Sequence, residues 1–199
     1  SIFEALHQVR AELSEHFPYP VIDVDGAEAD DVIGVLAEYS QTSNTDGLLP
    51  SAEPFLVLSG DHDFNQLQKW SNVKQYAPVQ KKFVKITESP SAVLMEHIIM
   101  GDKGDGVPNI LSDDDTFVTG SRQRPMKKDK VAEWKHQKPE DFITSDEMWR
   151  NFQRNRELVD LSRIPEDIKN DVIDSYEKQK GGDRSGLLNY FIANRMKQM

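Results

Sequence analysis

The sequence contains no cysteine. Disulfide bonds and thiolate zinc sites are therefore excluded, which agrees with a reducing compartment, and we expect a cytoplasmic protein. No apolar run approaches the roughly 20 residues that a membrane-spanning helix needs, so we expect no membrane partner. The start also lacks the basic segment and apolar stretch of a secretory signal. It begins with Ser1 rather than Met and has the pattern of a helix interior, which is typical of a fragment.

Basic residues are in the minority, and the 199 residues carry a formal net charge of −10. This total argues superficially against a nucleic-acid partner, because phosphate contacts need lysine and arginine. The distribution is more informative. Residues 121–130 hold five basic side chains against the single acid Asp129, and residues 81–85 hold three lysines. Acids gather in separate short clusters, so the pattern suits a metal site beside a polyanion, although ordinary surface charge explains any single cluster equally well.

Hydrophobic periodicity in the first half of the chain predicts alternating strands and helices. Residues 18–24 and 55–60 are short apolar runs, typical of buried strands. Residues 26–41 have helical spacing and acids in the first turn, and a polar loop (42–54) follows. Residues 72–86 have the pattern of a strand and a hairpin. Strands that are apolar throughout, with helices between them, predict an α/β fold with a parallel sheet.

After about residue 90 the pattern becomes helical. Helical spacing recurs in five segments, which are residues 91–101, 127–137, 146–161, 165–180 and 186–196. We therefore divide the chain into an α/β part, residues 1–90, and an all-helical part, residues 91–199.

Three short acidic motifs stand at expected ends of strands or helices. EADD opens a helix, GDHDF ends a strand, and GDKGD follows a helix. In the second motif, a spacing of two puts both carboxylates on one side if the backbone is extended. In the third, a spacing of three puts both on one face if the backbone is helical. Ligands of open α/β sheets bind outside the carboxyl ends of the strands, so we expect the first two motifs to converge on one rim, over which the third could close. Their six acids are Glu28, Asp30, Asp61, Asp63, Asp102 and Asp105.

Six carboxylates brought together without a cation would repel one another and destabilise the fold. Oxygen ligands without cysteine or histidine suit Mg²⁺, for which Mn²⁺ can substitute, rather than zinc. Two such ions about 4 Å apart can activate a water and stabilise the leaving oxygen in phosphodiester hydrolysis. Each motif alone is a weak signal, but all three in order predict a two-metal site.

The order of the motifs resembles that of the 5′-nuclease family. EADD is followed by SGDHDFNQL and then by GDKGDGVPNI, as in flap endonucleases and the 5′-nuclease domain of bacterial DNA polymerase I. The segments NVKQYAPVQKKFVKI and NRELVDLSRIPEDI make the sequence most similar to ribonuclease H of T-even-like phages. The resemblance covers nearly the whole chain.

The resemblance implies a PIN-like nuclease core with a C-terminal helical DNA-binding region. It implies a Mg²⁺-dependent 5′-to-3′ exonuclease and flap endonuclease that removes RNA primers from lagging-strand fragments. The six acids carry over as metal ligands, with Glu28, Asp30, Asp61 and Asp63 catalytic and Asp31 in a supporting role. Its substrates would be DNA and RNA–DNA duplexes with a 5′ flap or 5′ end. A single-strand-binding protein and a sliding clamp are candidate partners.

The sequence departs from the family pattern after the third motif. Cellular members continue into a glycine-rich helix–hairpin–helix turn, often with a bound K⁺, which grips the duplex. Here VPNI runs into LSDDDTFVTGSRQRP, and this puts the K⁺ site in question. We therefore expect phosphate contacts from basic residues in and after the third motif. These are Lys103, Arg122, Arg124, Lys127, Lys128 and Lys130.

Family members also begin with a strand carrying an aspartate and with a basic helical arch, and this sequence starts after both. We therefore expect the chain to need its own N-terminal segment as a partner for activity. One alternative is a DNA-structure-binding fragment without catalysis. Another is a Ca²⁺-binding or structural module, suggested by DVDG (23–26) and SDDD (112–115), but the acids that an EF-hand needs do not follow DVDG. His97 has no ligand spacing and is expected to pack on a helix or face the surface.

Overall fold

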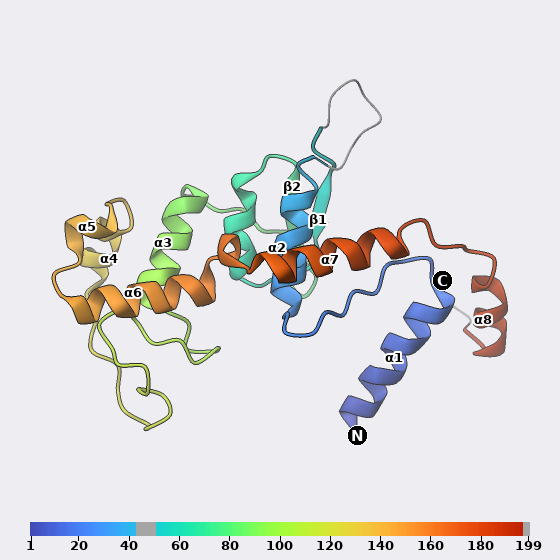
Figure 1. Cartoon of the computed structure of the whole chain (residues 1–199), viewed down its shortest axis with the longest axis horizontal. Helices are drawn as coiled ribbons and strands as arrows, with labels where there is room; N and C mark the ends of the chain where they lie inside the picture. Colours follow the sequence, from blue (N-terminus) through green and yellow to red (C-terminus); the bar gives the residue numbers. More distant parts are fainter. Residues whose placement is uncertain (43–50, 197–199) are drawn as a thin grey trace. The chain divides into compact units, whose positions relative to one another are not determined.

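The computed structural model describes residues 1–42 and 51–196, and most of the predicted polar loop 42–54 lies outside them. The chain forms two compact units (Figure 1). Unit 1 consists of Ser1–Glu28 and Glu166–Met199, and unit 2 of Ala29–Pro165. The boundary predicted from the sequence at residue 90, between an α/β part and a helical part, falls inside unit 2. The assignment of separate functions to these two parts stays a prediction.

Unit 2 contains a small mixed sheet in the order β1-β2-β3. β1 (Phe55–Val57) pairs in parallel with β2 (Val73–Ala77), and β2 pairs antiparallel with β3 (Lys82–Phe83). The parallel pair confirms the expected α/β architecture. The helix α2 (Ala29–Tyr39) and the 3₁₀ helix η1 (Asp63–Lys69) pack with the sheet around one apolar core. Its buried members are Ala37, Val57, Phe64, Leu67 and Val73.

The rest of unit 2 is mainly helical, as predicted, with an irregular stretch at residues 101–127. It comprises α3 (Pro90–Met100), α4 (Lys128–Trp134), α5 (Pro139–Phe142), α6 (Asp146–Val159) and the 3₁₀ helix η2 (Leu161–Arg163). Figure 1 shows α4 and α5 gathered beside α3 and α6. Side chains of all four helices, together with Ile110, form the larger apolar core. Ser89 and Ser145 cap α3 and α6 by accepting hydrogen bonds from backbone N–H groups, which fixes where these helices begin.

Unit 1 contains α1 (Ile2–His16), α7 (Glu166–Gln179) and α8 (Leu187–Ala193). Phe17 contacts the rings of Tyr190 and Phe191 edge-on, and the Tyr190 hydroxyl donates to Glu12. These contacts hold the first and the last helix of unit 1, α1 and α8, together. Among the described helices of both units, none combines the length and apolar character that crossing a membrane requires.

The strand predicted at residues 18–24 is wrong, because this segment is irregular. Pro18 and Pro20 remove two backbone donors that a sheet would need. Val21 is paired by a side chain instead of a neighbouring strand: its N–H donates to Oε1 of Gln179 at 2.9 Å, and its carbonyl accepts from Nε2 at 3.2 Å. The apolar run is therefore anchored to α7 rather than to a sheet.

Candidate functional site: an acidic cluster in unit 2

The second acidic motif follows β1 and is held by a buried amide of the neighbouring strand. Gln75 is 1% exposed, and its Nε2 donates to the carbonyls of Ser59 (3.0 Å) and Asp61 (2.6 Å). The Asp63 N–H donates to Oδ1 of Asp61 at 3.2 Å, so the backbone turns between the two acids and enters η1. The extended backbone expected here is therefore not observed. A buried amide and a side-chain turn fix the motif instead.

The third motif forms a tight turn at the end of α3, not the helical turn considered from the sequence. Gly101 adopts φ +66°, and a Cβ atom there would lie 2.3 Å from the carbonyl oxygen of Val107. The Val107 N–H donates to the carbonyl of Asp102 at 2.7 Å, which closes the turn. Oδ1 of Asp102 accepts from the N–H groups of Gly104 (2.6 Å) and Asp105 (3.3 Å). Both acids are thus carried on one backbone turn.

His97, in the last turn of α3, links the two motifs. Its Nδ1 lies 3.1 Å from Oδ1 of Asp63, and its Nε2 lies 3.3 Å from Oδ2 of Asp102. The His97 side chain is only 17% exposed. The expectation that this histidine faces the surface or only packs on a helix is therefore wrong. The sequence offers no local signal for its role, because its partners lie 34 residues before it and five after it.

The electrostatics place four of the predicted acids in one neighbourhood. Contact with the Asp63 carboxylate is the main cause that raises the pKa of His97, against the effect of burial, and Asp102 adds to it. Burial raises the pKa of Asp105, and the charges of Asp102, Asp63 and Asp61 raise it further. Burial opposes ionisation of Asp102, but hydrogen bonds from Gly104, Asp105 and His97 hold its pKa below the ordinary value. The second and third motifs therefore converge, as expected.

The first motif stands at the start of α2. Asp30 and Asp31 lie in the first turn, where the helix dipole favours carboxylates. α2 packs against η1, which begins at Asp63. Glu28 is exposed and is the last residue of the first stretch of unit 1, directly before α2. Its membership, and that of Asp30, in the same site stays a prediction.

The carboxylate oxygens of these motifs are suitable ligands for a hard cation, although the described side chains do not surround a common metal position. In the described part of the chain, no three histidine or acidic side chains are arranged as a metal site. Oδ1 of Asp63 is buried and has no well-aligned hydrogen-bond donor among the described residues, although Nδ1 of His97 lies 3.1 Å away. A buried carboxylate oxygen without a hydrogen bond is costly, and a divalent cation satisfies such an oxygen.

The basic segment 121–130 is anchored to the chain that follows the third motif. Oε1 of Gln123 accepts from the Asn109 N–H at 2.7 Å, and Asn109 donates in turn to the carbonyl of Arg124 at 2.9 Å. The Arg124 guanidinium lies 3.1 Å from Glu147 and 3.9 Å from Asp113, so acids of this chain already compete for it. The remaining predicted contacts are exposed, and they are Lys103, Arg122, Lys127, Lys128 and Lys130.

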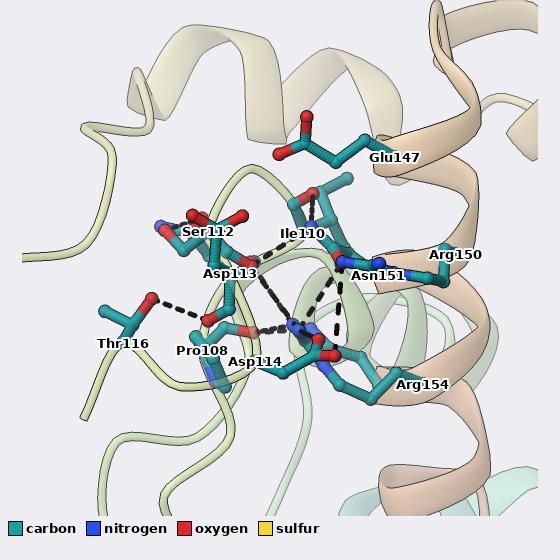
Figure 2. A network of polar contacts seen from close by, with 12 residues as sticks. Pro108, Ile110, Ser112, Asp113, Asp114, Thr116, Glu147, Arg150, Asn151 and Arg154 are labelled. Atoms are coloured by element: carbon teal, nitrogen blue, oxygen red, sulfur yellow. Dashed lines mark hydrogen bonds and ion pairs between the residues drawn. The ribbon is translucent and has the colours of Figure 1, made fainter. Parts of the chain in front are cut away.

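Polar side chains of α6 hold the chain that follows the third motif. Figure 2 shows Asn151 and Arg154 reaching from α6 toward residues 108–116. Asn151 donates to the carbonyls of Ile110 (3.2 Å) and Ser112 (3.0 Å), and Arg154 to that of Pro108 (2.9 Å). Asp114, one of the acids considered for Ca²⁺, is paired with Arg154. These contacts fix one end of the turn that carries Asp102 and Asp105.

Asn155, one helical turn after Asn151, spans both ends of that turn. It is 0% exposed, and its Nδ2 donates to the carbonyls of Ile98 and Pro108, each at 2.8 Å. Ile98 lies in α3 before the acids and Pro108 lies after them. Nothing in the sequence indicates this role, because the pattern of α6 resembles that of any amphipathic helix.

Comparison with known proteins gives a consistent result. Residues 88–199 match the family described as T4 RNase H, C terminal. The chain is 32% identical over 195 residues to ribonuclease H of Enterobacteria phage T4, covering 96% of this chain and 61% of that protein. It thus spans less than two thirds of the length of this curated relative.

Two solved structures share the fold at 16% identity. One is a lysine-to-alanine mutant of the T5 5′-exonuclease, with a TM-score of 0.52 over 90% of this chain and 77% of that chain. The other is a T5 protein co-crystallized with metal ions, with a TM-score of 0.54 over 89% of this chain and 69% of that chain. Together with the family match over more than half of the sequence, these results confirm the family that the motifs indicated. The chain belongs to the T4 RNase H family of T-even-like 5′-nucleases.

Proposed function

We propose that this chain carries the larger part of a Mg²⁺-dependent 5′-nuclease, an exonuclease and flap endonuclease that removes RNA primers from lagging-strand DNA. The observation that carries the proposal is the convergence of the second and third motifs, in which His97 contacts Asp63 and Asp102 and the charges of Asp61, Asp63 and Asp102 act on Asp105. The T4 relative is a ribonuclease H, and a T5 structural neighbour is a 5′-exonuclease. The proposed setting is the cytoplasm of a host cell.

The residues that would hold two Mg²⁺ ions, or Mn²⁺ in their place, are Glu28, Asp30, Asp61, Asp63, Asp102 and Asp105. When bound, the ions would supply an activated water and stabilise the leaving oxygen of the phosphodiester. The chain itself contributes charge and position. Its anchored basic segment offers cations to the phosphates of a duplex, and its backbone turns hold the carboxylates at fixed places. The His97 ring lies between Asp63 and Asp102, and a bound cation would compete with it for these carboxylates.

A second candidate function is binding of branched DNA without cleavage. It is favoured by the absence, among the described residues, of three acidic or histidine side chains arranged around a common metal position. In this case the missing part of the relative's length would be needed to complete the site, as a separate segment or partner. A single-strand-binding protein or sliding clamp remains a candidate partner in either case.

One assay separates the two candidates. The chain is incubated with Mg²⁺ and a 5′-labelled flap duplex, alone and with a polypeptide that supplies the part of the T4 relative's length that this chain does not span. Release of a short 5′-labelled product in either reaction supports the nuclease, provided that Asp63→Asn abolishes it. Retention of the duplex in a gel without any product in either reaction supports the binding function and contradicts the nuclease.

A further inference from the structure

The β2–β3 hairpin presents lysines and aromatic rings along one face. Lys74 and Tyr76 alternate along β2 with buried residues, so both point away from the core. Phe83 of β3 lies opposite Tyr76, and the two rings meet edge to face at 5.3 Å. Lys85 follows Phe83 by two residues and is exposed. We call Lys74, Tyr76, Phe83 and Lys85 the hairpin stripe.

The stripe has the features of a surface that is open to a ligand. Phe83 is 53% exposed, so part of its ring is accessible to a ligand. A hollow of about 340 Å³ lies along the hairpin and is lined in part by Lys74, Phe83 and Lys85. Within the described residues, 1–42 and 51–196, neither of these two lysines forms an ion pair. Their charges are therefore available to an anion in an otherwise acidic chain.

The turn of the hairpin lies beside the acidic cluster. A Cβ atom on Gly60 would lie 3.3 Å from Oε1 of Gln80 and 3.5 Å from Cβ of Ala77. Gln75, between the two residues of the stripe on β2, donates to the carbonyl of Asp61 at 2.6 Å. The stripe therefore includes residues of β2, the same strand that positions the second motif. The turn of the hairpin lies beside that motif.

Lysine also occupies a strained position in this turn. Lys81 adopts φ +52°, a conformation that costs a non-glycine residue free energy and that glycine or asparagine usually fills. Lys82 follows it and is exposed. Two adjacent cations thus directly follow Gln80, whose side chain lies beside Gly60. Strain that persists at such a position is typical of a functional site.

We propose that the hairpin stripe binds single-stranded nucleic acid, with an unpaired base stacked on Phe83 and phosphates at Lys74, Lys85 and the Lys81–Lys82 turn. This inference rests on the proposed nuclease function for its ligand, which is the single-stranded 5′ arm of a flap. An exposed ring between lysines recognises unpaired bases, since base pairs in a duplex hide the faces that stack on aromatic side chains. The strand then runs along the hairpin toward the carboxylates that would cut it.

Binding of a fluorescein-labelled oligothymidylate to the full chain, followed by anisotropy at several NaCl concentrations, tests the stripe. Phe83→Ala should weaken binding about five-fold or more, because the stacked base loses its platform. Phe83→Trp should retain or tighten binding and keeps the hairpin packed. Lys74→Gln with Lys85→Gln should flatten the slope of log affinity against log salt by about 1.4, the value for two phosphate contacts on a single strand.

A matched control replaces two exposed lysines elsewhere, Lys138→Gln with Lys178→Gln, and should leave both affinity and slope unchanged. Photo-crosslinking with an oligonucleotide that contains 5-iodouracil locates the contact directly. We expect adducts on Phe83 or Tyr76. Adducts confined to residues 121–130, or wild-type affinity in Phe83→Ala, would overturn the proposal.

The stripe and the nuclease can fail separately. Flap cleavage is measured on the same preparations, with the tryptophan fluorescence of each variant as the check on folding. Binding that depends on Phe83, without any cleavage by the wild type either alone or with the polypeptide that supplies the rest of the T4 relative's length, supports the stripe and contradicts the nuclease. Cleavage by the wild type with single-strand binding that is indifferent to Phe83 contradicts the stripe and leaves the nuclease standing.

Discussion

Replacing Asn155 with alanine should destabilise unit 2 through the carbonyl groups that the amide now satisfies. Asn155 is completely buried, and Nδ2 donates to the Ile98 and Pro108 carbonyls. Pro108 keeps a second donor from Arg154, so its loss is one hydrogen bond, worth about 1 kcal/mol. Ile98 loses the only donor found for its carbonyl among the described residues, at a cost of about 1–3 kcal/mol. We expect Asn155→Ala to lower the free energy of unfolding by about 2–4 kcal/mol.

Urea unfolding followed by tryptophan fluorescence measures this change, because Trp70, Trp134 and Trp149 all lie in unit 2. The matched control is Asn170→Ala, at an exposed position of α7, which should stay within about 0.5 kcal/mol of the wild type. Asn155→Asp keeps the shape but replaces the donor by an acceptor that faces two carbonyls, and should cost at least as much as the alanine variant. A free energy of unfolding for Asn155→Ala within 0.5 kcal/mol of the wild type would refute the reasoning.

Three further predictions concern the turn, the histidine and the basic segment. Gly101→Ala should cost about 2–5 kcal/mol in urea unfolding, because its Cβ meets a backbone carbonyl at positive φ, whereas Gly106→Ala, with open space around it, should cost about 1 kcal/mol. The folded-state pKa of His97 is raised above the ordinary 6.5. The contribution of this residue to the free energy of unfolding is therefore fully present below pH 6.5 and is lost as the pH rises through the folded-state pKa. The free energy of unfolding measured in EDTA should therefore fall above pH 6.5. Equal slopes of this free energy against pH in the wild type and His97→Gln would contradict the prediction. Neutralising the basic segment should weaken duplex binding and flatten the dependence of the affinity on salt concentration. An unchanged slope of log affinity against log salt would show that the duplex binds elsewhere. The residues to neutralise are Arg122, Arg124, Lys127 and Lys128.

The sequence predicted those features that follow from local pattern. Helical spacing located α2, α3, α6 and α7, an apolar run located β1, and the strand-and-hairpin pattern of residues 72–86 located β2. It failed at residues 18–24, since an apolar run does not reveal whether a neighbouring strand or a glutamine of α7 will satisfy its backbone. A strand makes its backbone hydrogen bonds with another segment, whereas a helix makes them within its own residues.

The acids of the site were predictable because motifs place them at the ends of elements, and the convergence of the second and third motifs was observed. Their backbone conformations were not, because side-chain hydrogen bonds replace regular structure at both turns. The residues that support the acids were missed for a different reason. Gln75, His97 and Asn155 have no motif of their own, and their roles arise from contacts with segments distant in sequence.

The central claim is that the acidic cluster is a divalent-metal site, and titration of the full chain with Mn²⁺ tests it most directly. The electron paramagnetic resonance signal of free Mn²⁺ is followed for the wild type, for Asp63→Asn and for a control, Asp174→Asn, at an exposed position of α7. We predict saturable binding by the wild type and the control, and its loss in Asp63→Asn. Equal binding by Asp63→Asn and the wild type, or no binding by the wild type, would contradict the account.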